Sequence, residues 1–479
     1  MSSETRKSVR AWLEEKRPQI VRDILRLARI PSISDSGAQP GPYGKACRDV
    51  LDEALKLGAE LGFFTQNYDY KVGALWLGEG ETAPGSIGIW GHLDVVPPGE
   101  GWLHAQPFSP IEKEGYLIGR GVADNKGPAV GALYAALAMK ELGLRPAKPL
   151  RIFLGCSEET GMDDATHYVA NYEAPALSLV ADGSFPVGFA EKGIIEIKLL
   201  GDAPLSEAVL ALRGGQASNI VPDLAEIELK AGEALTEKLQ KGLPDGLEAE
   251  HGEKSVKIRA HGVASHSARP EGGVNAIQKL LRGLFFAGIL GDGDENALAF
   301  LLKAGIGLNG FGFGIACEDE ISGALTSVGS LLSLDEQRRP VLQFNIRYPV
   351  TAKLEELLAG IAKACERGAY KAQLVQANKP NHFPKESPVV KALTKAFNEV
   401  AGAQAEPYAM SGGTYARKLP NGLVFGMGLP KGLGHAQDPA LFPPGHGGAH
   451  APDEALYVDD LLKGIEIYIL ALAEWTGEL

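Results

Sequence analysis

Three short apolar runs of this chain end close to side chains of the kinds that bind metal ions. Each of the runs IGIW, LRIFLG and LSLVA is followed within four residues by histidine, aspartate or glutamate. Runs of this kind predict buried strands, and the loops after strand ends are favoured places for sites in an α/β sheet. We therefore expect one shared cleft lined by these residues: His92, Asp94, Glu158, Glu159 and Asp182.

Helical and strand patterns alternate up to about residue 190, which is typical of an α/β sheet covered by helices. The pattern then changes to strands and helices joined by polar, acidic connectors such as GDGDEN, up to about residue 384. A chain of 479 residues is too long for one ordinary core. The sequence therefore predicts a first domain over residues 1–192 and a second, inserted domain over residues 193–384.

Composition and charge exclude several classes of protein. The formal net charge of −13 argues against a nucleic-acid partner, because binding a polyanion requires a basic face. No segment reaches the roughly 20 apolar residues needed to span a bilayer. The four cysteines are scattered and form no CxxC pair, which argues against a disulfide scaffold. We expect a cytoplasmic protein that binds neither nucleic acid nor membranes.

His92 and Asp94 lie two residues apart at the end of the first run, and such residues point to the same face of a strand. His92 could then bind a metal ion while Asp94 orients its ring, because a metal-bound imidazole usually passes its other N–H to a carboxylate or carbonyl. Taken alone, the two residues are better explained as a hydrogen-bonded polar pair without a metal.

The wider set of motifs changes that balance. GHLDVVP, GRGVADNKGP, SEETG, an aspartate closing a later strand, SHSARPEGG and a late histidine before PDE together resemble the superfamily of PepV-type dipeptidases, carboxypeptidase G, aminoacylase and desuccinylases. The motifs run from about residue 30 to residue 454, so the resemblance covers nearly the whole chain. It implies a mixed-sheet α/β hydrolase domain for two metal ions with an inserted α+β lid, and a return to the first domain over residues 385–479.

The resemblance also implies a complete ligand set for two divalent ions. Asp124 matches the bridging carboxylate, and the remaining ligands are His92 and Asp182 for one ion and Glu159 and His450 for the other. Two ions about 3.5 to 4 Å apart polarise a carbonyl and activate a water, and three protein ligands per ion leave an open position. Carboxylate and imidazole ligands suit Zn²⁺, although Mn²⁺ and Co²⁺ can occupy such sites.

Two of these assignments are choices between neighbouring residues. Glu159 resembles the ligand and Glu158 the general base, which takes a proton from the attacking water and hands it to the leaving amine. The alternative is a pair of exposed surface glutamates. His450 is preferred over His446, because the family's late ligand precedes a short segment that ends in glutamate. Cys156, beside the glutamates, is expected to be a small buried hydrophobe rather than a nucleophile.

The inserted domain carries residues that resemble substrate contacts. His266 in SHSARPEGG matches a lid histidine that donates to the substrate carbonyl oxygen, a contact that contributes roughly 3 kcal/mol to oxyanion stabilisation. Its alternative is a polar residue at a helix start. The large lid resembles the PepV type, in which this histidine acts within one chain, so a monomer is favoured over a homodimer.

Further residues are candidates for holding the substrate. Arg347 offers a planar fork that suits a carboxylate, although an arginine on a strand is often only an ion-pair residue. Asn219 resembles a lid residue that contacts the substrate near the oxyanion. Ser411, Gly412 and Gly413 offer a hydroxyl and backbone N–H groups at a predicted helix start, where a terminal carboxylate could bind.

These features together predict a metal-dependent exopeptidase that hydrolyses short peptides, above all dipeptides. The alternatives among enzymes are an N-acyl-amino-acid amidohydrolase and a carboxypeptidase, because the same metal ions cleave any amide placed over them. A non-catalytic binding protein on the same fold would usually have lost ligands or the general base. This sequence retains all of them.

Overall fold

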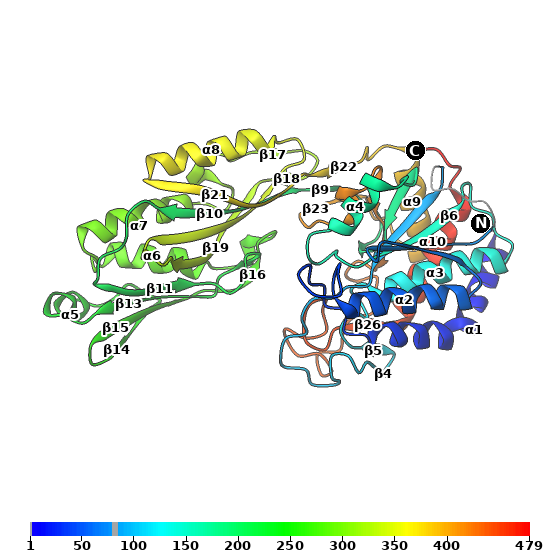
Figure 1. Cartoon of the computed structure of the whole chain (residues 1–479), viewed down its shortest axis with the longest axis horizontal. Helices are drawn as coiled ribbons and strands as arrows, with labels where there is room; N and C mark the ends of the chain where they lie inside the picture. The colour runs from blue at the N-terminus through cyan, green and yellow to red at the C-terminus, as the bar shows by residue number, and fades with distance from the viewer. Residues whose placement is uncertain (1, 79–84) are drawn as a thin grey trace. The chain divides into compact units, whose positions relative to one another are not determined.

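The computed structural model describes residues 2–78 and 85–479, which form two compact units (Figure 1). The first unit comprises the chain up to Phe189 with His382–Tyr408 and Gly413–Leu479, and the second comprises Ala190–Asn381 with Ala409–Gly412. The main segment of the second unit thus begins three residues before the predicted start of the insertion and ends three residues before its predicted end. Strands β9 (Gly188–Glu191) and β22 (Asn381–His382) cross the two boundaries between the units. The boundaries between the compact units therefore lie within strands, a few residues away from the positions where the sequence pattern changes.

A nine-stranded mixed sheet is the framework of the first unit. Its central strands β6, β3, β7 and β24 pair in parallel, whereas the outer pairs β1–β2, β2–β6 and β24–β9 are antiparallel. In sheet order the strands are β1 (Phe64–Tyr68), β2 (Val72–Trp76), β6 (Leu150–Gly155), β3 (Ile87–His92), β7 (Leu177–Val180), β24 (Gly422–Val424), β9 and β22, with β23 (Tyr408–Met410) beside β9.

Helices cover both faces of this sheet. A side chain at Gly73 would meet Leu51 of α2 and one at Gly91 would meet Ala129 of α3, so these helices approach the same face closely. On the other face, Trp90 and Phe153 contact the ring of Tyr168 in α4. The helices of the first unit are α1 (Ser3–Ala28), α2 (Lys45–Glu60), α3 (Lys126–Glu141), α4 (Asp163–Asn171), α9 (Pro388–Ala401), α10 (Val458–Glu474) and the short 3₁₀ helix η3 (Tyr415–Lys418).

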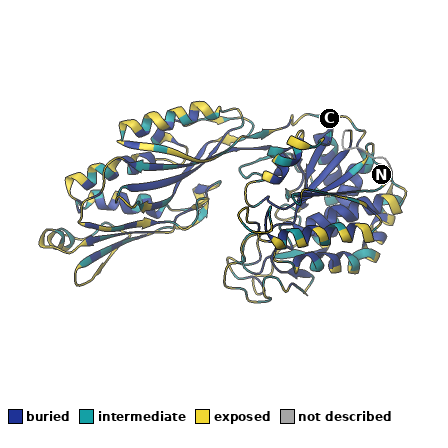
Figure 2. Ribbon diagram, in the orientation of Figure 1, coloured by how far each residue is buried: buried dark blue, intermediate teal, exposed yellow. Residues whose placement is uncertain are grey.

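The parallel strands β3, β6 and β7 bring their carboxyl ends to one edge of the sheet. Their residues are almost entirely buried (Figure 2), and backbone hydrogen bonds continue past the strand ends, from Leu93 N to Gly155 O and from Ala181 N to Trp90 O. This edge is therefore rigid where the polar residues begin. Two small sheets lie nearby in sequence: β8 (Gly183–Ser184) with β25 (Met427–Gly428), and β26 (Ala455–Tyr457) with β5 (Tyr116–Ile118) and β4 (Ile111–Lys113).

The second unit is built on an eight-stranded antiparallel sheet with helices on one face. Strand β10 alternates buried and half-buried residues, and Ile195, Ile197 and Leu199 point into the core that the helices cover. In sheet order its strands are β14 (Leu247–His251), β15 (Ser255–His261), β13 (Leu224–Lys230), β11 (Val209–Gly214), β19 (Thr326–Leu334), β20 (Pro340–Tyr348), β10 (Gly193–Gly201) and β21 (Tyr370–Asn378).

Helices and two small sheets complete the second unit. Its helices are α5 (Glu233–Gln240), α6 (Ala276–Phe286), α7 (Asp292–Ala304), α8 (Leu354–Arg367), η1 (Pro270–Gly272) and η2 (Phe311–Phe313), and its two-stranded sheets pair β12 (Ile220–Val221) with β16 (Ser265–His266) and β17 (Glu318–Asp319) with β18 (Gly323–Ala324). Over the described residues of both units, no helix is long and apolar enough to cross a membrane. The predicted α/β class, with a mixed sheet, is confirmed.

Candidate active site

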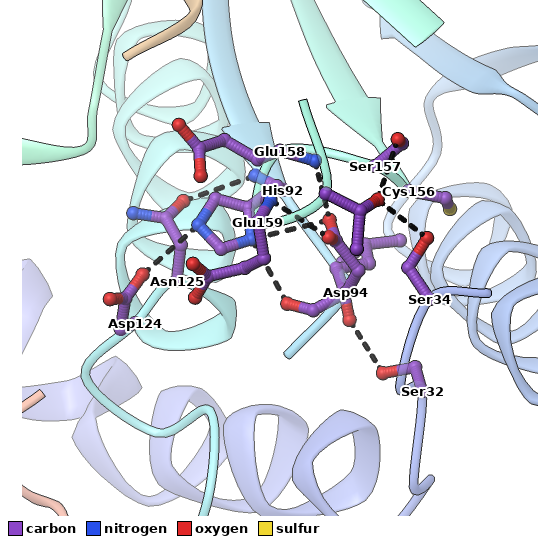
Figure 3. A network of polar contacts seen from close by, with 12 residues as sticks. Ser32, Ser34, His92, Asp94, Asp124, Asn125, Cys156, Ser157, Glu158 and Glu159 are labelled. Carbon is purple, nitrogen blue, oxygen red and sulfur yellow. Dashed lines mark hydrogen bonds and ion pairs between the residues drawn. The ribbon is translucent and has the colours of Figure 1, made fainter. Parts of the chain in front are cut away.

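Strand β3 carries His92 to the buried edge of the first unit's sheet, where its side chain is fully buried. Its Nε2 atom lies 3.0 Å from Asp124 Oδ1, and its Nδ1 atom lies 3.0 Å from the backbone carbonyl oxygen of Asp94 (Figure 3). The carboxylate of Asp94 is 3.4 Å from the same nitrogen. The imidazole ring is therefore oriented at Nδ1 by both the backbone and the side chain of Asp94.

The carboxylate of Asp94 also fixes the turn that follows β6. Its two oxygens accept hydrogen bonds from the backbone N–H groups of Glu158 and Glu159, each 3.1 Å long (Figure 3). Glu158 is 8% exposed and the side chain of Glu159 is 11% exposed. These glutamates therefore face the interior, and the alternative of an exposed surface pair is wrong.

The two carboxylate oxygens of Asp124 face two different histidines. Oδ1 lies 3.0 Å from His92 Nε2, and Oδ2 lies 3.1 Å from His450 Nε2. Glu159 Oε1 is 2.9 Å from the same nitrogen of His450, and Asp182 Oδ2 is 3.7 Å from His92 Nε2. All five predicted ligands therefore meet at this edge of the sheet.

Potential ligand atoms in this cluster lie close enough to share a cation. Two overlapping groups have their ligand atoms within 4.8 Å of one another: His92 with Glu158 and Asp182, and His92 with Asp124 and Glu159. Imidazole nitrogen and carboxylate oxygen are ordinary ligands of Zn²⁺ and similar divalent ions. The donor set therefore fits the metal ions that the resemblance implies, with Glu158 near enough to contact a bound group.

The electrostatics of the cluster also favour added positive charge. Burial and the neighbouring Asp124 raise the pKa of Asp182 to about 7, and burial and Asp182 raise the pKa of Glu158 well above its ordinary range. Hydrogen bonds to Asp124 and Glu159 raise the pKa of His450 to about 10. Crowded carboxylates disfavour their own ionised forms, so protons or divalent cations stabilise the cluster.

Arg120 and Glu454 form a buried ion pair that hydrogen-bonds to the backbone of the candidate ligands Asp124 and His450. Neither residue was predicted to be functional. Glu454 is fully buried and pairs with Arg120 Nη1 at 2.6 Å. One oxygen of Glu454 accepts backbone N–H groups of Gly121, Ala123 and Asp124, at 3.1, 2.9 and 3.0 Å. Both residues stand in motifs quoted above, GRGVADNKGP and HAPDE, but no periodic pattern connects positions 334 residues apart.

Asn125 is a third supporting residue that the sequence did not predict. Its Oδ1 accepts the backbone N–H of His92 at 3.2 Å, and its Nδ2 donates to Ala181 O at 2.8 Å and to Asp182 Oδ1 at 3.1 Å. A single side chain thus holds the ends of β3 and β7 in register with the ligands. Its position directly after Asp124 was the only available signal.

The two histidines of the late loop have different partners. His450 reaches the carboxylates of Asp124 and Glu159, whereas His446 Nδ1 lies 2.7 Å from Asp453 Oδ2. His450 and Asp453 both have left-handed backbone conformations, with φ of 64° and 53°. Such conformations are uncommon for residues other than glycine and concentrate at functional sites. The loop is therefore held in a specific shape around His450.

A cavity of about 400 Å³ adjoins the ligand cluster within the first unit. Its lining includes Asp124, Asp182 and Asp460 together with His435 and Tyr457, whose rings stack with their centroids 3.9 Å apart. No sequence motif indicated His435. The cavity offers room for part of a small substrate beside the ligands.

The predicted lid residues His266, Asn219 and Arg347 belong to the second unit. Ser411 and Gly412, which were expected in the returning part of the first domain, also belong to the second unit, whereas Gly413 belongs to the first. His266 ends strand β16 with an exposed side chain, and Asn219 directly precedes its partner strand β12. Arg347 is buried in β20, and its Nη1 donates to Ser411 O at 3.3 Å. The helix expected after Gly413 is only the four-residue η3, which Thr414 caps at its start and which ends where Leu419 takes an extended conformation.

A mixed sheet with imidazole and carboxylate groups gathered at its strand ends, where they could bind metal ions, is typical of a metal-dependent hydrolase. The sequence model of Peptidase family M20/M25/M40 matches residues 88–474. The chain belongs to this family, so the expectation of a peptidase is confirmed.

Individual relatives extend over nearly the whole chain. The Bacillus subtilis protein named "Putative dipeptidase YtjP" is 32% identical over 96% of this chain and 97% of its own length. A "Putative dipeptidase" of Staphylococcus epidermidis is 29% identical over 96% of this chain and 98% of its own length. Among solved structures, Saccharomyces cerevisiae Dug1p superposes with a TM-score of 0.60 at 14% identity, covering 99% of both chains, and human carnosine dipeptidase 1 with a TM-score of 0.58 at 14% identity, covering 98% of both. These two likenesses concern the fold.

Proposed function

We propose that the protein is a dipeptidase that depends on two divalent metal ions, with Zn²⁺ as the first candidate and Mn²⁺ or Co²⁺ as alternatives. The observation that carries the proposal is that the two oxygens of Asp124 face His92 and His450. A carboxylate with an imidazole at each oxygen can serve one ion on each side. The relatives named as dipeptidases support the substrate class.

The chain's own residues would hold two ions as follows. Asp124 is shared, His92 and Asp182 hold one ion, and Glu159 and His450 hold the other. When bound, the ions polarise the scissile carbonyl and lower the pKa of a bound water. Asp94, Asn125 and the Arg120–Glu454 pair keep the ligands in place, because each hydrogen-bonds to the backbone or ring of a ligand residue.

Glu158 is the proposed general base. It accepts a proton from the attacking water as the water oxygen bonds to the carbonyl carbon, and it donates that proton to the amine as the C–N bond breaks. Two features support this role: Asp94 holds its backbone N–H, and in the metal-free protein burial raises the pKa of its carboxyl. A raised pKa brings a carboxyl closer to the working range of a base that must also act as an acid.

Apart from Gly413, which belongs to the first unit, the proposed substrate contacts belong to the second unit. The ring of His266 accepts a hydrogen bond from Ala268 N at Nδ1, 3.1 Å away, so in the neutral ring the hydrogen is on Nε2. Nε2 is then the atom that donates to the carbonyl oxygen and stabilises the oxyanion. The residues that we propose to contact the substrate or its terminal carboxylate are Arg347, Asn219, Ser411, Gly412 and Gly413.

We further propose that the enzyme acts as a monomer in the cytoplasm, with the histidine supplied within one chain. The four cysteines form no disulfide, and three of them are buried. Free thiols of this kind are typical of a reducing compartment.

A substrate screen tests the function. The purified chain is loaded with Zn²⁺ or Mn²⁺ and assayed with dipeptides, tripeptides, C-terminally amidated dipeptides and N-acetyl amino acids. We expect hydrolysis of dipeptides, little hydrolysis of tripeptides, and loss of activity on chelation with recovery on adding metal back. Activity confined to N-acetyl amino acids would replace the dipeptidase assignment by an amidohydrolase.

A further inference from the structure

Three polar side chains share one face of strand β20 in the second unit. Residues two apart on a strand point the same way, so Gln343, Asn345 and Arg347 lie on one face, while the residues between them belong to the hydrophobic core on the other. The three polar residues are buried, with 7%, 0% and 6% of their surface exposed. Buried polar groups require hydrogen-bond partners, and the partners of Asn345 connect several proposed substrate contacts.

Asn345 is the centre of this network. Its Oδ1 lies 2.9 Å from Arg347 Nε and 2.9 Å from Ser267 Oγ. Its Nδ2 donates to Glu196 Oε1 at 3.0 Å. A guanidinium can only donate, so the amide atom that faces Arg347 must be the oxygen. One oxygen atom therefore accepts hydrogen bonds from both Arg347 and Ser267.

Ser267 ties this oxygen to the segment that carries His266. The backbone N–H of Ser267 donates to Asn219 O at 2.8 Å, and its carbonyl accepts from Thr326 Oγ1 at 3.1 Å. Ser267 itself is fully buried, whereas the adjacent His266 is exposed. Ser267, directly after His266, is thus held by two hydrogen bonds of its backbone and by one of its hydroxyl, which donates to Asn345.

We infer that Asn345 is a positioning residue that fixes Arg347 and the His266 segment relative to each other. The inference rests on the proposed function, in which Arg347 holds the substrate's terminal carboxylate and His266 its carbonyl oxygen. Because both are tied to one oxygen atom, the separation of these two contacts is set by Asn345. A fixed separation favours substrates in which the cleaved carbonyl and the free carboxylate lie the matching distance apart.

A pair of matched substitutions on β20 separates this role from general stability. Asn345→Leu keeps the number and branching of the side-chain heavy atoms and removes the three hydrogen bonds of the amide. Gln343→Leu is the control, because Gln343 lies two residues earlier on the same buried face and donates to the other oxygen of Glu196, also at 3.0 Å. Both substitutions leave Glu196 short of one donor, but only the first removes the acceptor of Arg347 and Ser267.

The readout is the separation of KM from kcat for a dipeptide. With Asn345→Leu we expect KM to rise about tenfold, the scale of one hydrogen bond to a charged group, and kcat to fall as well. With Gln343→Leu both constants should change less than about threefold. In an Arg347→Ala background the effect of Asn345→Leu on KM should shrink to about twofold or less, because the two residues act through one contact.

Ser267→Ala tests the hydrogen bond from Asn345 to the His266 segment. This substitution is mild, so the variant should fold even if Asn345→Leu does not. It removes the link from Asn345 to the His266 segment while leaving the Asn345–Arg347 contact, so kcat should fall by about fivefold or more with KM within about twofold. An unchanged kcat of Ser267→Ala overturns the inference. So does an Asn345→Leu variant with the same KM and kcat as Gln343→Leu, or one whose effect on KM is undiminished in the Arg347→Ala background. If the wild-type enzyme cleaves no dipeptide, the proposed function is wrong. If the wild type is active and any of the contrary results is obtained, only the proposed role of Asn345 is wrong.

Discussion

The buried carboxylate of Glu454 accepts a hydrogen bond of 3.0 Å from the backbone N–H of Asp124. Its other oxygen pairs with Arg120, whose Nη2 donates to the backbone carbonyl of His450 at 3.2 Å. One buried ion pair therefore joins the loop of the proposed bridging ligand to the loop of the late histidine. Both loops must keep this geometry to hold the proposed pair of ions.

Glu454→Gln should destabilise the protein and weaken metal binding, because the amide leaves the buried guanidinium of Arg120 without its counter-charge. We expect the free energy of unfolding to fall by about 3 kcal/mol or more, as measured by urea denaturation. The control is Glu466→Gln, which breaks a pair with Arg10, a side chain that is 60% exposed. That change should cost about 1 kcal/mol or less, and equal losses would contradict the special role of Glu454.

Glu158→Gln should retain both ions and lose turnover, because the amide keeps the shape of the side chain but removes the base. We expect kcat to fall by at least about 100-fold, with metal content measured on the same sample. Glu159→Gln is the matched comparison and should instead lower metal occupancy. Near-normal activity of Glu158→Gln at full occupancy would show that the base is another residue.

Asp124→Ala should empty or disorder both metal sites, because it removes the one carboxylate that faces both histidines. Asp182→Ala should affect mainly the ion that His92 holds, because Asp182 Oδ2 lies 3.7 Å from His92 Nε2. Elemental analysis of the purified variants distinguishes the two results. Two ions retained in Asp124→Ala would refute the bridging role.

His450→Ala should lower metal occupancy from two ions towards one, whereas His446→Ala should leave both in place. The reason is that His450 contacts Asp124 and Glu159, while His446 contacts Asp453. Metal titration of the two variants provides the test. The reverse result would move the ligand to His446.

Metal binding should release a proton from His450. In the metal-free protein, hydrogen bonds to Asp124 and Glu159 raise the pKa of His450 to about 10, so at neutral pH a binding cation must displace a proton. The affinity for this ion should rise by about tenfold per pH unit on the acid side of that pKa. Calorimetry in buffers of different ionisation enthalpy counts the released protons, and His450→Ala should release one fewer.

The same shift has the opposite sign for folding of the metal-free protein. The folded state binds this proton more tightly than the unfolded chain, in which the pKa has its ordinary value of 6.5. The resulting stabilisation is complete below about pH 6.5 and is lost as the pH rises towards 10. Thermal unfolding of metal-free protein across this range should therefore show a loss that His450→Ala does not share.

Local sequence signals predicted the elements that position the site. Helix α9 shows how local these signals are, because Ser387 caps its first turn by accepting from Val390 N and Gly402 ends the helix with φ of 64°. The strand expected over residues 177–181 is observed as β7. Such signals act over a few residues, so they can be read directly from the chain.

The sequence by itself determined which residue types stand at the strand ends, and the motif order made His92, Asp124, Glu159, Asp182 and His450 the candidate ligands. Only the tertiary structure decided what each of them touches. In the folded protein the two glutamates face the interior, and His446 contacts Asp453 rather than the carboxylates that His450 contacts. Arg120 pairs with Glu454, 334 positions away in the chain. The tertiary structure likewise brought Asn345 between Arg347 and Ser267. The physical reason is that hydrogen bonds and ion pairs depend on distances of about 3 Å, and packing between remote segments, rather than local periodicity, sets those distances.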